Sequence, residues 1–93
     1  MCKPFCYIYL IHCSGTSFFK IGIARSVESR LDTLQPACPF ELVLVNHVRY
    51  PSRSQAILSE MALHEKYAHN LVHGEWFSFQ HDELEGVKAE MST

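Results

Sequence analysis

The sequence has 93 residues, enough for one small domain but not for two. Its 8 basic and 10 acidic side chains give a net charge of −2, which excludes a strongly basic nucleic-acid-binding protein of the histone type but leaves room for a local basic patch. Apolar residues make up 47% of the chain and charged residues 19%, a balance that excludes an intrinsically disordered protein.

The chain contains no apolar stretch of the ~18–20 residues that a membrane helix needs. The short apolar run at 5–11 is interpreted as a strand rather than an export signal, because it carries two tyrosines and ends in His12. We therefore expect a cytoplasmic protein without membrane association. Its four cysteines are expected to be reduced thiols; they are Cys2, Cys6, Cys13 and Cys38.

The first half of the chain predicts a β-hairpin followed by a helix. Residues 5–12 and 18–23 are rich in aromatic and β-branched types, and turn residues separate them. Ser26 is a suitable N-cap for a short helix over 26–35. A third strand is expected over 40–50, buried on both faces because residues 42–45 are continuously apolar.

The second half predicts a long helix, a short edge strand and a last helix. The long helix is expected over 52–71, with Gly74 as its stop signal. An edge strand is expected over 75–79, and a short helix within the tail 80–93.

The predicted order is therefore β-β-α-β-α-β. It indicates an α/β (α+β) fold with a small, mainly antiparallel central sheet flanked by helices. We expect a single domain over 1–93 with its core at about 5–79.

Two residues of the long helix break its apolar pattern. Glu60 and His64 fall on the same face as Ile57 and Met61. A carboxylate in an apolar stripe is costly unless a cation or hydrogen-bond donors meet it, so Glu60 is either a functional ligand or a salt-bridged rim residue. His64 is either a ligand or a hydrogen-bonded core residue.

Polar residues interrupt two other apolar segments. Arg30 stands beside the apolar stripe of the first helix, where it either snorkels to water or aims its guanidinium at a phosphate. Lys20 lies inside an apolar strand, and Gly22 in the same strand is typical of a close approach by backbone or ligand.

Taken in order, these residues resemble the motifs of the GIY-YIG nuclease superfamily. The matching segments are Tyr7-Ile8-Tyr9, Lys20-Ile21-Gly22, Arg30, Glu60 and Gly74-Glu75-Trp76-Phe77. The last segment and the lysine resemble a branch known from phage open reading frames and meiotically up-regulated fungal proteins. The chain departs from the superfamily pattern at three positions: Tyr7 replaces a glycine, Lys20 a tyrosine, and Leu34 a histidine.

The resemblance implies an endonuclease that hydrolyses phosphodiester bonds with one divalent cation, Mg²⁺ or Mn²⁺, held by Glu60. Arg30 would clamp the scissile phosphate, and Tyr9 would contact or deprotonate the attacking water. A cationic Lys20 beside Tyr9 would favour its phenolate and so lower its pKa. His64 would orient Glu60 or contact the water shell of the metal, with Tyr7 and Gly22 as further auxiliary residues.

The expected substrate is nucleic acid, with DNA as the first choice. Its contacts are expected from four arginines: Arg25, Arg30, Arg49 and Arg53. A module this small is expected to bind weakly or to need a partner protein for targeting. Two alternatives remain open: a catalytically inactive relative that binds nucleic acid or protein, and a zinc-binding module built on Cys2, Cys6 and a histidine.

Overall fold

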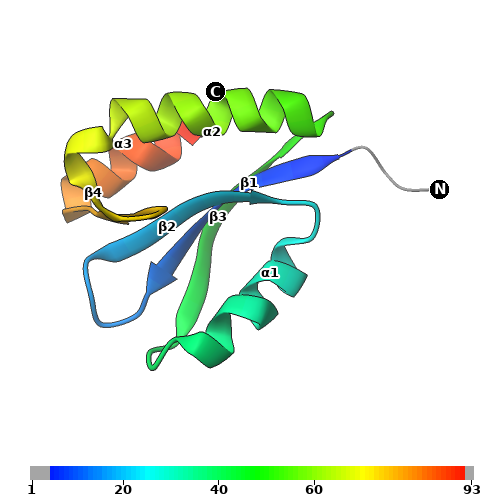
Figure 1. Ribbon diagram of the computed structural model, residues 1–93. Helices are drawn as coiled ribbons and strands as arrows, with labels where there is room; N and C mark the ends of the chain where they lie inside the picture. Colours follow the sequence, from blue (N-terminus) through cyan, green and yellow to red (C-terminus); the bar gives the residue numbers. More distant parts are fainter. Residues whose placement is uncertain (1–4, 92–93) are drawn as a thin grey trace.

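A computed structural model describes residues 5–91, which form an antiparallel five-stranded sheet and three α-helices (Figure 1). The strands are β1 (Cys6–Cys13), β2 (Phe18–Ala24), β3 (Leu42–Tyr50), β4 (Leu71–His73) and β5 (Trp76–Ser78). The helices are α1 (Val27–Leu34), α2 (Arg53–Lys66) and α3 (His81–Met91), with short 3₁₀ turns η1 (Gln35–Ala37) and η2 (Ala68–Asn70). The predicted α+β class is confirmed.

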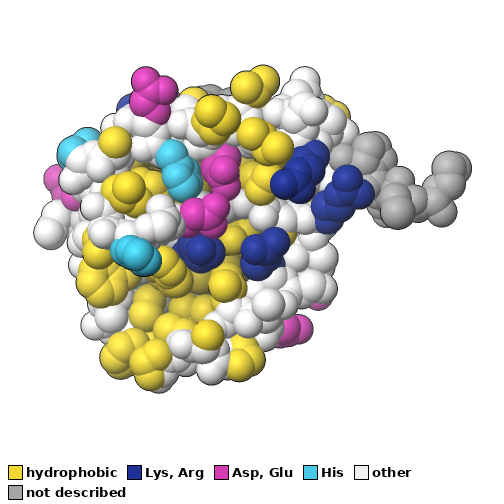
Figure 2. All heavy atoms as spheres, viewed as in Figure 1, with side chains coloured by type: hydrophobic (Ala, Val, Ile, Leu, Met, Phe, Trp, Pro, Cys, Tyr) yellow, Lys and Arg dark blue, Asp and Glu magenta, His cyan; other side chains and the backbone are white. Residues whose placement is uncertain are grey.

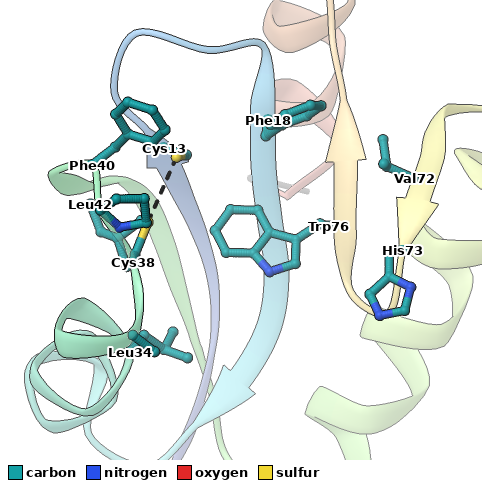
Figure 3. Close-up of a pocket in the computed structure, with 11 residues that line it drawn as sticks. Cys13, Phe18, Leu34, Cys38, Phe40, Leu42, Val72, His73 and Trp76 are labelled. Carbon is teal, nitrogen blue, oxygen red and sulfur yellow. Dashed lines mark hydrogen bonds between the residues drawn. The ribbon is translucent and has the colours of Figure 1, made fainter.

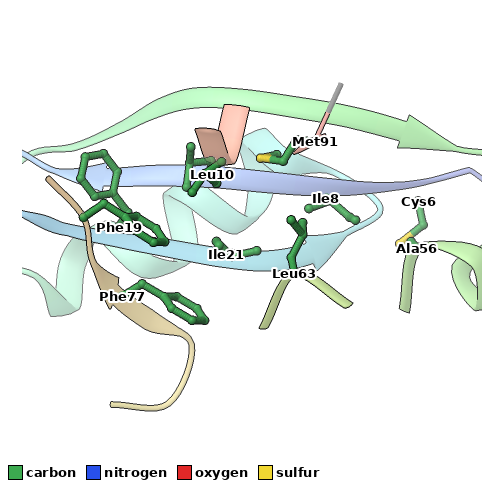
Figure 4. Packing of buried hydrophobic residues seen from close by; sticks show 11 residues of the cluster. Cys6, Ile8, Leu10, Phe19, Ile21, Ala56, Leu63, Phe77 and Met91 are labelled. Atoms are coloured by element: carbon green, nitrogen blue, oxygen red, sulfur yellow. The ribbon is translucent and has the colours of Figure 1, made fainter. Parts of the chain in front are cut away.

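The sheet has the order β3-β1-β2-β5-β4, and helices cover both of its faces (Figure 1). Residues alternate along β1, so Ile8 and Leu10 point to the core beneath α2 and α3, while Tyr9 and Ile11 point to the core beneath α1. Figure 4 shows the first of these cores, where Leu63 and Met91 pack with strand residues.

The predicted N-cap Ser26 is confirmed, and Ser52, where the second helix was expected to begin, caps α2. The Ser26 hydroxyl accepts a hydrogen bond from the backbone of Ser29, and the Ser52 hydroxyl accepts one from the backbone of Gln55. Each serine satisfies one of the backbone N–H groups that a helix leaves unpaired at its start. Polar residues at these two points therefore fix where α1 and α2 begin.

The prediction that the strand at 40–50 is buried on both faces is wrong. Among the described residues, β3 pairs only with β1 and lies at one edge of the sheet. Val43 is accordingly 42% exposed. A continuous run of apolar residues can form an edge strand whose one face packs on the core while its other face is partly exposed.

The predicted end of the second helix is also wrong. α2 stops at Lys66, and the chain continues through η2 into the unpredicted strand β4. Gly74 has a φ of +60° and makes the turn between β4 and β5 rather than ending a helix. β5 lies between β2 and β4, so it is not the edge strand that the sequence predicted.

The buried stripe of α2 differs from the expected one. Met61 is 59% exposed, whereas Ala56 and Leu63 are buried. The expected helix in the tail is present as α3, whose Val87 and Met91 belong to the core, so the core extends beyond residue 79. Within residues 5–91, no helix is both long and apolar enough to cross a membrane.

Candidate functional site

The candidate site lies at the edge of β2, beyond the point where β5 stops pairing with it. β5 pairs with residues 18–20 only, and the backbone N–H of Ile21 then donates to the carbonyl of Glu75 (3.2 Å). The rest of β2 lies between α1 on one face of the sheet and α2 on the other (Figure 1). Figure 2 shows acidic, basic and histidine side chains gathered at the middle of the face seen there.

Gly22 allows two functional side chains to approach the sheet closely. It lies directly opposite Tyr9 in the β1–β2 ladder. A Cβ atom at this position would collide with the Tyr9 hydroxyl and would lie 2.9 Å from Oε1 of Glu75. The glycine therefore makes the space in which Tyr9 and Glu75 meet.

The Tyr9 hydroxyl is buried and charged groups surround it. Among the described residues it has no hydrogen-bond partner. Burial is the main cause that raises its pKa to about 12; Glu75 and Glu60 raise it further and Arg30 lowers it. Arg30 and Glu60 come from helices on opposite faces of the sheet, and both affect the pKa of Tyr9 at the edge of β2.

Glu60 lies between Ala56 and Leu63 on the inward face of α2 and is half-buried. Its Oε2 is buried and has no hydrogen-bond partner in the part of the chain that the structure describes. Burial and the Glu75 carboxylate raise the pKa of Glu60, and the neighbouring side chains of His64, Lys20 and Arg53 oppose the rise.

Lys20 has a different partner from the expected one. Its Nζ lies 3.2 Å from Oε1 of Glu75 and 5.5 Å from the centre of the Trp76 ring. The expected lowering of the Tyr9 pKa is wrong for the protein by itself: burial and Glu75 raise that pKa, and the group that lowers it is Arg30 rather than Lys20. Lys20 instead offsets the negative charge of Glu75, and it lowers the pKa of Glu60.

His64 connects α2 to the free edge of β2. Its Nε2 donates a hydrogen bond to the carbonyl of Ile21 (2.9 Å), and its ring meets Phe77 edge-on. The same histidine acts on the pKa of Glu60. Of the two alternatives, ligand or hydrogen-bonded core residue, the contacts match the second, and His64 also lies beside the acidic centre formed by Glu60 and Glu75.

Three of the four expected arginines line one cavity at this edge. The cavity has a volume of about 440 Å³, and Arg25, Arg30, Arg53 and Glu75 line it together with apolar residues of β1 and β2. Arg49 lies elsewhere, on β3, with its guanidinium over the Phe5 ring. Tyr7 also lies apart from the acidic centre, against His47 of β3.

The acidic centre suits a cation that needs few protein ligands. Among residues 5–91, no group of three or more histidine, cysteine, aspartate or glutamate side chains is arranged to hold a metal ion. Mg²⁺ is commonly held by only one or two carboxylates plus water. The unpartnered oxygen of Glu60 and the adjacent Glu75 carboxylate match that simpler requirement.

The zinc-binding alternative depends on Cys2, which lies outside the described residues. Cys6, Cys13 and Cys38 are free thiols, as expected.

The residue that sequence reasoning missed is Glu75, which contacts Lys20 and raises the pKa of both Tyr9 and Glu60. Its place within the Gly74–Phe77 motif was the available signal.

Comparison with known proteins identifies a family for the chain. The model of the T5orf172 domain, a GIY-YIG-like domain of phage open reading frames, matches residues 6–92. No curated protein and no solved structure matches the chain. The family match spans every helix and strand described above, and on that basis the chain belongs to the T5orf172 domain family.

Proposed function

We propose that this protein is a divalent-metal-dependent endonuclease that hydrolyses phosphodiester bonds in DNA. One observation carries the proposal: two buried oxygens, Tyr9 Oη and Glu60 Oε2, have no hydrogen-bond partner among residues 5–91, and the charges of both Glu60 and Arg30 affect the pKa of Tyr9 at the edge of β2. Polar atoms left unpaired in a folded protein are costly, and they suit a site that is completed by substrate, water and a cation.

Glu60 is the residue that would hold the cation, with Glu75 beside it. The Glu75 carboxylate raises the pKa of Glu60, which means that the two negative charges repel each other, and a divalent cation bound between them would offset that repulsion. When bound, Mg²⁺ or Mn²⁺ would neutralise charge on the phosphate and make bound water more acidic.

Arg30 would bind the scissile phosphate. It is exposed on α1 and lines the same cavity as Arg25 and Arg53, so the DNA strand could run past three guanidinium groups. A guanidinium matches phosphate with two parallel hydrogen bonds, which fixes its orientation as well as its charge.

Tyr9 would orient the attacking water as a neutral phenol. With a pKa of about 12 it keeps its proton at neutral pH, so in the protein by itself it is a hydrogen-bonding group and not a base. His64 would position Glu60 by anchoring α2 to the carbonyl of Ile21.

A second candidate function is nucleic-acid binding without cleavage. The raised pKa of Tyr9 favours it, because a protonated phenol is poorly suited to activate water. The retention of an unpartnered carboxylate on the inward face of α2 favours the nuclease, since a module that only binds anionic DNA gains nothing from it.

Nicking of supercoiled plasmid, with Mg²⁺, with Mn²⁺ and with a chelator, tests the proposal. The parent protein should nick only with a divalent cation, and Glu60→Gln should lose nearly all activity. Glu65→Gln is the matched control, because Glu65 is exposed on the same helix. Binding of DNA without nicking under every condition would favour the second candidate; equal nicking by Glu60→Gln would refute the site.

A further inference from the structure

A second cavity lies on the α1 side of the sheet and is apolar. It has a volume of about 420 Å³, and its lining includes the aromatic residues Phe18, Phe40 and Trp76 (Figure 3). Its walls also hold Cys13 and Cys38, whose sulfurs lie 3.9 Å apart. Of the residues that the structure describes, no aspartate, glutamate, lysine or arginine lines it.

This cavity adjoins the candidate active site through neighbouring residues of the chain. Glu75 lines the cavity with the arginines, and Trp76 lines the apolar one. Lys20, which pairs with Glu75, lies over the Trp76 ring and is opposite Trp76 in the β2–β5 ladder. Figure 3 shows the Trp76 ring extending from β5 across β2 toward Cys38 and Leu34.

The aromatic lining is unusually open to solvent for large apolar side chains. Phe18 is 40% exposed and Phe40 is 51% exposed. The cavity therefore offers several aromatic ring faces to a flat ligand, from two exposed phenylalanines and one tryptophan.

We infer that this cavity receives an unpaired base of the nucleic-acid strand whose backbone lies along Arg25, Arg30 and Arg53. The inference rests on the proposed function and specifies its substrate as nucleic acid with at least one unstacked base. A nucleotide joins an anionic phosphate to a flat, uncharged base, and the two adjacent cavities show the same division: one with three guanidinium groups, one aromatic and without such charges.

Trp76 supplies a direct signal, because it is the only tryptophan of the chain. The experiment titrates the full chain, in the presence of a chelator, with a single-stranded DNA oligonucleotide. A strand of equal length and charge built from abasic nucleotides is the matched ligand. The base-containing strand should quench the Trp76 fluorescence and bind more tightly; the abasic strand should bind through its phosphates without quenching.

Substitutions at the mouth of the cavity separate stacking from charge. Phe18→Ala and Phe40→Ala should each weaken binding of the base-containing strand by about 5- to 150-fold, the range that loss of one base–aromatic stack produces, and should leave binding of the abasic strand unchanged. Leu58→Ala is the control, since Leu58 is 67% exposed on α2 and does not line the cavity. A cooperative thermal unfolding transition like that of the parent would show that the variants fold.

Equal affinity for both strands, or unchanged affinity in both phenylalanine variants, would overturn the inference while leaving the nuclease proposal intact. A hydrophobic dye that stays bound at saturating oligonucleotide would overturn it too, and would assign the cavity to an apolar partner. Failure to bind either strand would instead contradict the proposed function itself.

Discussion

Gly22 and Tyr9 face each other across the β1–β2 ladder, and the missing Cβ of the glycine is the space in which the tyrosine hydroxyl lies. The first prediction follows from this contact. Gly22→Ala should destabilise the fold by about 1–3 kcal/mol, because the added methyl group displaces a buried ring, and it should abolish nicking. Chemical denaturation and the nicking assay measure the two effects.

Gly86→Ala is the control for that substitution. Gly86 lies within α3, and a Cβ there would make only ordinary contact with the Tyr67 hydroxyl at 3.7 Å. Alanine also favours a helix over glycine, so this variant should be at least as stable as the parent. A Gly22→Ala protein of parental stability and activity would contradict the described contact.

Tyr9→Phe should separate stability from activity. Removal of a buried hydroxyl that has no partner among residues 5–91 should raise the free energy of unfolding by up to about 1 kcal/mol, while nicking falls because no phenol orients the water. Thermal unfolding and nicking rates check both halves. A variant that is clearly less stable than the parent would show that the hydroxyl has a stabilising partner.

Glu60 should make the protein less stable as the pH rises. Its folded-state pKa lies above that of the unfolded chain, so the folded protein binds more protons between the two values and loses stability as pH climbs through that window. Glutamine has no titrating carboxyl group at this position, so Glu60→Gln should be more stable than the parent at neutral pH. Unfolding measured from acid to neutral pH tests this.

Glu65→Gln is again the comparison, and it should keep the parental pH dependence. Added Mg²⁺ or Mn²⁺ should raise the melting temperature of the parent at neutral pH, by mass action on the folded state, and should not do so in Glu60→Gln. If both glutamine variants followed the parental curve, Glu60 would not be the group that titrates.

The sequence predicted the parts of the fold that depend on local chemistry. Strand composition located β1 and β2, the expected cap Ser26 located the start of α1, and the expected start at 52 lies at the cap of α2. The end of α2 was missed because a glycine with positive φ serves a helix end and a strand turn equally well, and Gly74 does the latter. β4 has only three residues, all of them exposed, and so shows no period to detect.

Part of the candidate site was predictable from the sequence, but Glu75 and the electrostatics of the site were not. Motif order brought together Tyr9, Lys20, Arg30 and Glu60, which the structure places around the edge of β2. The pKa of Tyr9 depends instead on burial and on Glu75, whose position follows from how β5 pairs with β2. Only the three-dimensional register shows that Glu75, not Tyr9, is the partner of Lys20.

Lys20→Met should move the acid limb of the pH–activity profile to higher pH. Lys20 lowers the pKa of Glu60 and neutralises Glu75, so its loss makes the carboxylate that would hold the cation harder to ionise. Lys66→Met is the control, because Lys66 pairs with Glu90 on the surface. An acid limb that stays in place would show that Lys20 does not act on the acidic centre.

The most direct test of the account is the single-turnover rate of DNA nicking in Mg²⁺ for Arg30→Met beside Arg49→Met. Both remove one exposed arginine, but only Arg30 lines the cavity at the edge of β2 and acts on Tyr9. The account predicts a fall of about 10²–10³ in rate for Arg30→Met, from lost stabilisation of the phosphate in the transition state, and a near-parental rate for Arg49→Met. Equal rates for the two variants would contradict it.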